Sequence, residues 1–494
     1  MASCATEIDG KREVGEKDSK NDVSDPTHTP VDQGTQILYN AAVNKIGIRL
    51  HPQPTADFLD PLNWSSLQKH GILSIVMFKY FLFTYLTTTT VPSFTEIQDQ
   101  YLINYSQVNW TVAVPALGLS VGPLIWSSLG DIYGRRVVFI VGTTISLVST
   151  IGAAVADTYS GYMAARFFQG FGVSPASIVG MAVVGGLLGL VSALWINWFN
   201  AILFASLLLL ELFFMPETLY PRNKMLQQMP RLDGNKALPS DIEKQIAGDN
   251  TVTSISPAET LPSEPRRTKN LPFINWRPIP GMRHPKPWDS ITRFVLTFQL
   301  PAVVIAVVGY SFVWYWWILS VITMVPAAYA TYTPLIQGLL FLGLFLGTFL
   351  SEIGCSGRLS DFILEKLSKR NGNIRVPEMR LWLAYPAILV TTVAAGIQIG
   401  NTLTTSYIVD CYPLQTTSVV TFYAVFLNLS AFINPFFIAS WQASSGWTRT
   451  FTTQGLIVLA GGGVVFGVLH KFGARMRAKA PEPSWVNPEF DMDP

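Results

Sequence analysis

Charged residues are scarce in this sequence. Asp, Glu, Lys and Arg make up 13% of its 494 residues, about half of the roughly 25% found in an average soluble domain. Hydrophobic residues reach 49%, which excludes an intrinsically disordered protein and argues against a soluble enzyme. The net charge of +2 does not indicate nucleic-acid binding, which needs a strongly basic face.

Cysteine and histidine are also rare, at three and five residues. Cys4, Cys355 and Cys411 are far apart in the sequence, and no pair has the spacing of a disulfide framework or a zinc site. The histidines are scattered and lie outside the apolar stretches. We therefore expect no metal and no cofactor. The sequence also shows no nucleophile motif or phosphate-binding loop, so we do not expect an enzyme.

The charges that do occur are concentrated. Four segments, 1–68, 217–290, 356–380 and 470–494, hold 52 of the 66 charged residues. Between them lie apolar stretches of about 20 residues, the length of a helix that crosses a bilayer. The sequence therefore predicts an all-α polytopic membrane protein. The ten predicted spans are 71–93, 108–129, 137–156, 161–190, 193–215, 294–325, 333–353, 381–406, 417–440 and 450–469.

The spans form two groups of five around a polar segment, which indicates two pseudo-symmetric helical bundles. The predicted organisation, in chain order, is a disordered cytoplasmic tail, an N-terminal transmembrane bundle, a central cytoplasmic loop, a C-terminal transmembrane bundle and a second cytoplasmic tail. These parts cover 1–68, 69–216, 217–290, 291–471 and 472–494. The first tail is too polar for a signal peptide.

Loop charge and span count disagree. Basic residues favour the cytoplasm, and both the central loop and residues 357–380 are rich in Lys and Arg. With five spans in the first half, the central loop would lie on the opposite side from the N-terminus. An even number of spans in each half would place every basic loop in the cytoplasm.

Residues 130–136, between the second and third spans, read Gly-Asp-Ile-Tyr-Gly-Arg-Arg. The glycines permit a tight turn and close helix approach. Asp131 can pair with Arg135 or with a helix N-terminus, which would form a latch that opens and closes. The alternative is a plain basic stop signal at a helix end. The gating-loop residues under this hypothesis are Gly130, Asp131, Gly134, Arg135 and Arg136.

Together with residues 118–128, this segment resembles a signature of the major facilitator superfamily. Residues 60–65 (Asp-Pro-Leu-Asn-Trp-Ser) and 166–172 (Arg-Phe-Phe-Gln-Gly-Phe-Gly) are similar to patterns of its fungal twelve-span drug:proton antiporters. Pro216-Glu217-Thr218 closes the first half as it does in that group. The resemblance covers about residues 60–480 and implies the major facilitator fold.

The same resemblance indicates that segments are missing. The family's span-five motif is represented only by its end, residues 185–189, which follow span four directly. Residues 381–395 look like the start of span nine, and residues 396–400 like the middle of span ten. Loss of most of span five and of a span-nine/ten segment would leave about ten spans instead of twelve and would explain the conflict over topology.

The resemblance implies a secondary active transporter that exports small organic compounds, such as drugs, toxins or secondary metabolites, by proton-coupled alternating access. Its partners would be the lipid bilayer, a small-molecule substrate and protons, and it would act as a monomer in the plasma membrane with both termini in the cytoplasm. Two alternatives stay open. One is a truncated or mis-spliced member that does not transport, and the other is a polyamine or other nutrient transporter of the same fold.

Ionisable residues inside a bilayer are costly, so each is a functional candidate. The proton-coupling or cavity candidates are Arg166, Lys79, Gln169 and Glu211. The family resemblance implies that Arg166 assists proton transfer, and a snorkelling role is the alternative. Lys79 lies deep enough in the first span to face a cavity. For Glu211, near the end of its span, we favour a position at the membrane interface.

Two further features concern the surface. Asn104 and Asn109 begin glycosylation sequons in the first outer loop, and Asn104 is the better candidate because Asn109 lies too close to the membrane. Aromatic residues crowd 310–317, where an interfacial belt with lipid-facing bulk is favoured over a substrate cavity for most of them. The sequence does not identify substrate-binding residues.

Overall fold

The structure is a computed structural model, and it describes residues 64–88, 90–176, 193–217, 278, 283–332, 334–351, 359–371, 375–389 and 395–481. Throughout these ranges the regular structure is helical, with no strand. Most of the predicted N-terminal tail and most of the central loop lie outside the described residues. So do the predicted junction at 184–185 and the first two residues of the junction at 393–396.

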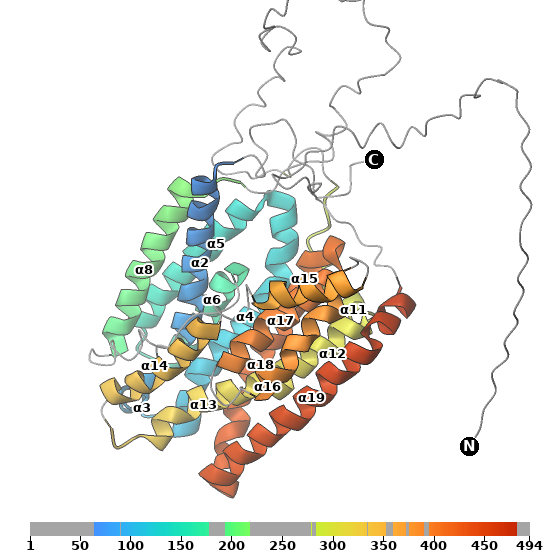
Figure 1. Ribbon diagram of the computed structural model, residues 1–494. Helices are drawn as coiled ribbons and strands as arrows, with labels where there is room; N and C mark the ends of the chain where they lie inside the picture. Colours follow the sequence, from blue (N-terminus) through green and yellow to red (C-terminus); the bar gives the residue numbers. More distant parts are fainter. Residues whose placement is uncertain are drawn as a thin grey trace, which may run out of the picture. The chain divides into compact units, whose positions relative to one another are not determined.

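The first half is built from helices that follow one another along the chain (Figure 1). They are α2 (Ser66–Thr88), η2 (Val91–Ser93), α3 (Phe94–Tyr101), α4 (Tyr105–Tyr133), α5 (Arg135–Ala154), α6 (Tyr159–Val173), η3 (Ser174–Ala176) and α8 (Ala193–Phe214). The predicted span 71–93 ends early, at Thr88, because Pro92 has no N–H to continue the helix.

The second half begins inside the predicted central loop. Its elements are α11 (Asp289–Thr297), α12 (Pro301–Gly309), the π turn η4 (Tyr310–Trp314), α13 (Tyr315–Ala328), α14 (Pro334–Ser351), α15 (Ser360–Arg370), η6 (Pro377–Leu383), α16 (Ala384–Leu389), α17 (Ala395–Cys411), η7 (Pro413–Gln415), α18 (Thr416–Ser445) and α19 (Trp447–Lys479). The last helix continues beyond 471, the predicted end of the bundle, because basic residues are favourable at a helix C-terminus.

Several of these helices are long and apolar enough to cross a bilayer. Among the described residues they are α4, α5, the continuous stretch Pro301–Ala328, α18 and α19, and α8 contains a shorter apolar stretch, Asn200–Phe214. The all-α polytopic prediction is confirmed. The predicted span 381–406 is divided among η6, α16 and α17, which are separated in part by residues outside the described ranges.

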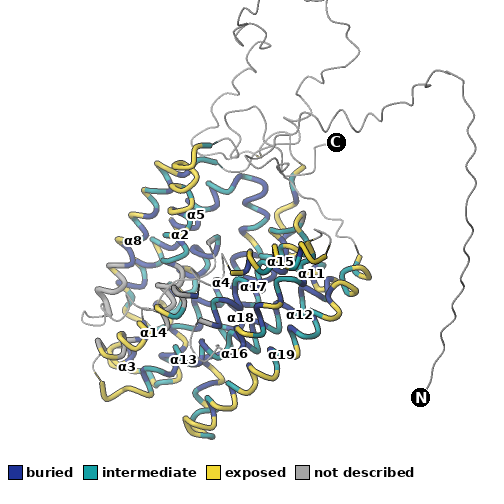
Figure 2. The backbone as a smooth tube through the Cα atoms, viewed as in Figure 1, coloured by how far each residue is buried: buried dark blue, intermediate teal, exposed yellow. Residues whose placement is uncertain are grey.

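Helix packing places α4 at the centre of the molecule. It contacts α6 within the first half and α18 and α11 of the second half, while α8 packs against both α2 and α5. Buried residues follow these inner faces (Figure 2). Helices α4 and α6 approach closely at Gly170. A Cβ at this position would lie only 2.1 Å from the Pro115 carbonyl oxygen, so only glycine fits there.

The aromatic residues at 310–317 lie inside the second half. Tyr310 and Trp314 are 0% exposed and form part of its hydrophobic core, and their neighbours in this stretch are partly or fully buried. The interfacial-belt interpretation was therefore wrong for Tyr310 and Trp314. The π turn η4 changes the helical phase at this point, and a π turn inside an α-helix often marks a functional position.

The contact between α4 and α6 predicts opposite effects for two helical glycines. Gly170→Ala forces the two backbones apart and should destabilise the protein by about 1–3 kcal/mol, as in an overpacked core. Gly152→Ala is the matched control, because nothing lies within 4 Å of its added Cβ. That variant should be neutral or stabilised by up to about 1 kcal/mol. Thermal unfolding in detergent measures both, and equal stability of the two variants would contradict the packing.

Candidate functional site

The predicted gating loop is mostly helical. Asp131 lies in the last turn of α4, and the helix ends at Gly134, whose φ is +97°. The Asp131 carboxylate forms an ion pair with Arg293 of α11, with 3.0 Å between Oδ2 and Nη1. The sequence predicted Arg135 or a helix N-terminus as the partner of Asp131. The pairing with Arg293, in the other half of the chain and 162 positions away, was not predicted.

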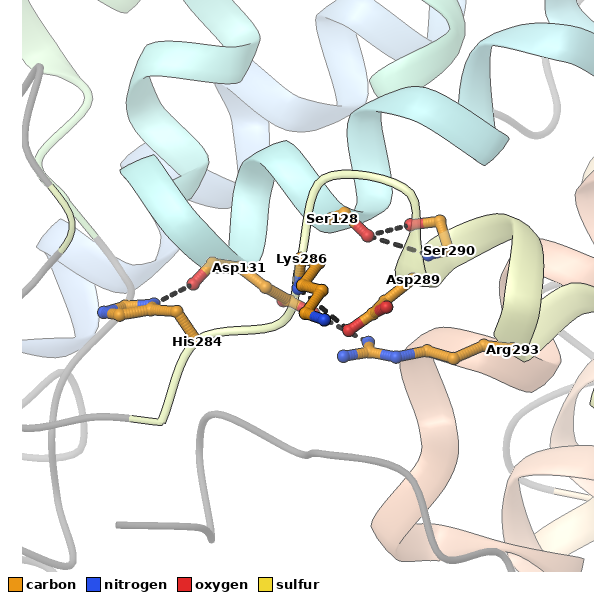
Figure 3. A network of polar contacts seen from close by, with 7 residues as sticks. All are labelled: Ser128, Asp131, His284, Lys286, Asp289, Ser290 and Arg293. Carbon is orange, nitrogen blue, oxygen red and sulfur yellow. Dashed lines mark hydrogen bonds and ion pairs between the residues drawn. The ribbon is translucent and has the colours of Figure 1, made fainter. Parts of the chain in front are cut away.

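Further polar contacts join the same two segments (Figure 3). The hydroxyl oxygens of Ser128 and Ser290 lie 2.6 Å apart, and the Ser290 N–H donates to the Ser128 hydroxyl at 2.8 Å. The His284 ring lies 2.9 Å from the Asp131 backbone oxygen. We call these contacts, with the Asp131–Arg293 pair, the inter-half latch. These partners were not predicted, because His284 and Ser290 lie in the predicted central loop and Arg293 lies just before the next predicted span.

Glu217 holds the start of α5. The N–H groups of Arg135 and Arg136 donate to its two carboxylate oxygens at 3.0 and 3.2 Å, which places a negative charge at a helix N-terminus. Gly134 leaves room for this carboxylate, since an added Cβ would lie 2.2 Å from Glu217 Oε2. Gly130 is less constrained, with only Val138 at 4.0 Å.

Arg166 is fully buried and binds a backbone carbonyl. Its Nε and Nη2 donate to the Thr111 oxygen at 3.1 and 2.9 Å, and its Nη1 donates to Gln169 Oε1 at 3.1 Å. Thr111 lies four residues before Pro115, which is inside α4. Because proline has no N–H, the Thr111 carbonyl has no partner in its own helix. Arg166 supplies that partner and so attaches α6 to α4.

Gln169 extends the same polar network. Its Nε2 donates to the Thr150 hydroxyl at 3.1 Å, and its backbone oxygen accepts from Ser146 at 3.1 Å. Thr150 and Ser146 both lie on α5. Arg166 and Gln169 therefore join α4, α5 and α6, and neither has the interfacial position of a snorkelling side chain.

Lys79 and Glu211 form a buried ion pair. Lys79 Nζ lies 3.2 Å from Glu211 Oε1, and both side chains are 0% exposed. The Lys79 ammonium also donates to the Phe139 oxygen at 2.7 Å and lies 4.4 Å from the centre of the Phe139 ring. The interfacial position favoured for Glu211 was wrong, because α8 packs between α2 and α5 and turns this carboxylate inward.

A cavity of about 340 Å³ lies beside this pair, between the two halves. Phe139 and Tyr80 line it from the first half, and the opening turns of α18 line it from the second. Asp131 and Arg135 of the predicted gating loop also line it. Lys79 does not line this cavity, contrary to the prediction, but it contacts Phe139, which does.

The two sequons differ in exposure. Asn104 is exposed and caps α4, where its Oδ1 accepts from the Gln107 N–H at 2.8 Å. Asn109 is 2% exposed, on the buried side of α4. A bulky glycan does not fit at this buried position in the folded protein, and Asn104 stays the predicted position.

The chain is similar to several known proteins. Residues 76–189 match the family described as Major Facilitator Superfamily. MFS transporter cpaT of Aspergillus oryzae is 27% identical over 356 residues, which cover 65% of this chain and 65% of cpaT, just under two thirds. Protein HOL1 of Saccharomyces cerevisiae is 22% identical over 551 aligned positions, covering 89% of this chain and 92% of HOL1.

Two further similarities have wide coverage. Probable efflux pump mfs2 of Aspergillus flavus is 23% identical over 446 residues, which cover 78% of this chain and 98% of that protein. Among solved structures, the human organic anion transporter MFSD10 (TETRAN) is similar with a TM-score of 0.47 and 16% identity, over 80% of this chain and 99% of that chain.

The Arg166 contacts predict a specific rescue. Arg166→Met leaves the Thr111 carbonyl buried without a donor and should cost about 1–3 kcal/mol of stability. Adding Pro115→Ala returns an N–H to that carbonyl, so the double variant should regain most of the loss. Thermal unfolding of both single variants and the double variant tests this. If the double variant is as unstable as Arg166→Met alone, the carbonyl is not what Arg166 stabilises.

Proposed function

We propose that this chain exports small organic compounds by proton-coupled alternating access. It belongs to the major facilitator superfamily, whose members are integral, multi-pass membrane transporters with an all-α fold and are not enzymes. The names of relatives such as Probable efflux pump mfs2 and Efflux pump radE support export. We further propose that it acts as a monomer in the plasma membrane, with both termini in the cytoplasm. The two predicted bundles, 69–216 and 291–471, would be the parts that move.

The buried Lys79–Glu211 pair is the observation that carries the coupling proposal. A proton on Glu211 would leave the Lys79 ammonium buried without its counter-charge, and breaking a buried pair in this way costs about 3–5 kcal/mol. A rearrangement that exposes the ammonium would then be favoured. Because Phe139 contacts Lys79 and also lines the cavity, this rearrangement would reach the place where a substrate can bind.

The contacts between the halves support alternating access, because they differ at the two ends. At the end with Asp131, the inter-half latch is ionic and hydrogen-bonded. At the other end, Phe341 of α14 belongs to an apolar cluster with Val91, Phe94 and Val108 of the first half. We call this cluster the apolar seal. A transporter that opens to one side at a time needs one such closure at each end.

The Lys79–Glu211 pair predicts loss of coupling without loss of folding. Lys79→Gln with Glu211→Gln removes both charges together, so no unpaired charge stays buried. Efflux of a fluorescent organic dye from energised cells should then no longer respond to a protonophore. Glu365→Gln is the control, because its carboxylate is exposed on α15. Coupling is disproved if the double variant keeps the wild-type response to the protonophore.

If the inter-half latch closes the cavity at the end with Asp131, weakening the latch should make the cavity open there more often. Arg293→Met removes the partner of Asp131, and each 1–2 kcal/mol lost should raise the open population about 5–30-fold. The readout is labelling of Ser127→Cys, a cavity-lining position, by a membrane-impermeant thiol reagent in a background without native cysteines. Asp289→Asn is the control, since that carboxylate accepts from Lys286 in its own segment. Equal labelling rates for Arg293→Met and the control would contradict the latch.

A second candidate function is a family member that does not transport. The alignment with Protein HOL1 has 551 positions, more than the 494 residues of this chain, so that relative has segments without a counterpart here. Loss of most of span five and of a span-nine/ten segment would account for part of this difference. Reading a full-length transcript across 184–185 and 393–396 tests it. Additional coding sequence at both places would favour the exporter, and its absence would favour the inactive form.

A further inference from the structure

The short helix α15 combines apolar and basic residues on one exposed stripe. Phe362 is 60% exposed and Leu359 38% exposed. Lys366, Lys369 and Arg370 are exposed as well. Within α15, Phe362 lies four residues before Lys366, and Lys366 lies three residues before Lys369 and four before Arg370, which places these four side chains on one face of the helix. Leu359 directly precedes the first residue of the helix.

The opposite face of α15 is attached to the protein. Leu364 and Ser368, on that face, are each 6% exposed. Ile363, at the edge of the exposed stripe, is partly buried and packs against the core of the second half. The helix also contacts η6. Its exposed stripe is therefore held in a defined direction by the buried residues on its other side.

Contacts through η6 place α15 at the same end of the molecule as the inter-half latch. In η6, Glu378 pairs with Arg477 near the end of α19, and Arg380 pairs with Asp410 near the end of α17. The chain then passes through η7 into α18, whose first residue, Thr416, lines the cavity together with Asp131. Loop charge assigns this end to the cytoplasm.

The charge on the stripe favours an anionic partner. Lys366 lies 6.0 Å from the centre of the Phe362 ring, and Lys369 pairs with Glu365 at 2.6 Å. A hydrogen bond from Lys369 lowers the pKa of Glu365, so this carboxylate is charged at neutral pH. Arg370 and the nearby Arg375 add two further exposed cations, so the bases outnumber the acid along the exposed face.

We propose that α15 is a membrane-surface anchor that binds anionic phospholipids of the cytoplasmic leaflet. Phe362 and Leu359 enter the boundary between headgroups and acyl chains, and Lys366, Lys369 and Arg370 contact the lipid phosphates. Surface helices bind bilayers by this combination of apolar insertion and basic residues. The anchor fixes the position of the second half relative to the bilayer, and it does not depend on the direction of transport or on the substrate.

The test uses the full-length chain in detergent, titrated with phosphatidylserine or phosphatidylcholine, with binding followed by the shift in thermal unfolding. Lys366→Gln should weaken phosphatidylserine binding about fivefold, and the triple variant with Lys369→Gln and Arg370→Gln roughly a hundredfold. Phe362→Ser should weaken binding of both lipids and leave the preference for phosphatidylserine. Glycerophosphoserine, which has no acyl chains, should bind far more weakly than the lipid.

Arg449→Gln is the matched control, because that exposed arginine lies at the start of α19, the end away from Arg477. It should bind phosphatidylserine as the wild type does. Because all the substituted side chains are exposed, each variant should elute as a single species on size exclusion. The proposal is overturned if the triple variant retains wild-type affinity for phosphatidylserine, or if glycerophosphoserine binds as tightly as the lipid.

Discussion

A helix inside a bilayer cannot use water to satisfy a free backbone carbonyl, and this constraint accounts for the placement of the most deeply buried charge in α6. Pro115 interrupts the hydrogen bonding of α4 and frees the Thr111 carbonyl. Arg166 donates two hydrogen bonds to that oxygen. The arginine is thereby committed to joining two helices, and any part it has in proton movement must be compatible with that attachment.

The same solution recurs elsewhere in the first half. Pro175 has no N–H for the Phe171 carbonyl, and the Trp126 indole donates to it at 2.9 Å. Lys79 and Glu211 follow the related rule that a charge taken out of water needs a partner. The two kinds of contact differ in their response to a proton. Protonation of Glu211 would break the ion pair, whereas a backbone carbonyl that accepts from arginine has no group that a proton would neutralise. For this reason the proposed proton coupling is assigned to Lys79 and Glu211 and not to the backbone carbonyls.

The contacts between the halves could not be predicted from the sequence. Asp131 was predicted as a latch residue because it lies in a glycine-containing turn beside two arginines. Its partner Arg293, and the Ser128–Ser290 contact, lie 162 positions away. Such pairs depend on the end of α4 meeting the start of α11, and spacing along the chain carries no information about which helix ends become neighbours.

The sequence by itself determined that the chain is helical and crosses a membrane, because a helix satisfies its own backbone groups and apolar length is visible in the sequence. It also identified Lys79 and Asp131, because charges stand out in apolar stretches. Only the tertiary structure decided that Glu211 faces Lys79 and that Arg293 faces Asp131. Partner choice depends on which helix faces meet, and close approach at residues such as Gly170 sets those faces through contacts distant in sequence.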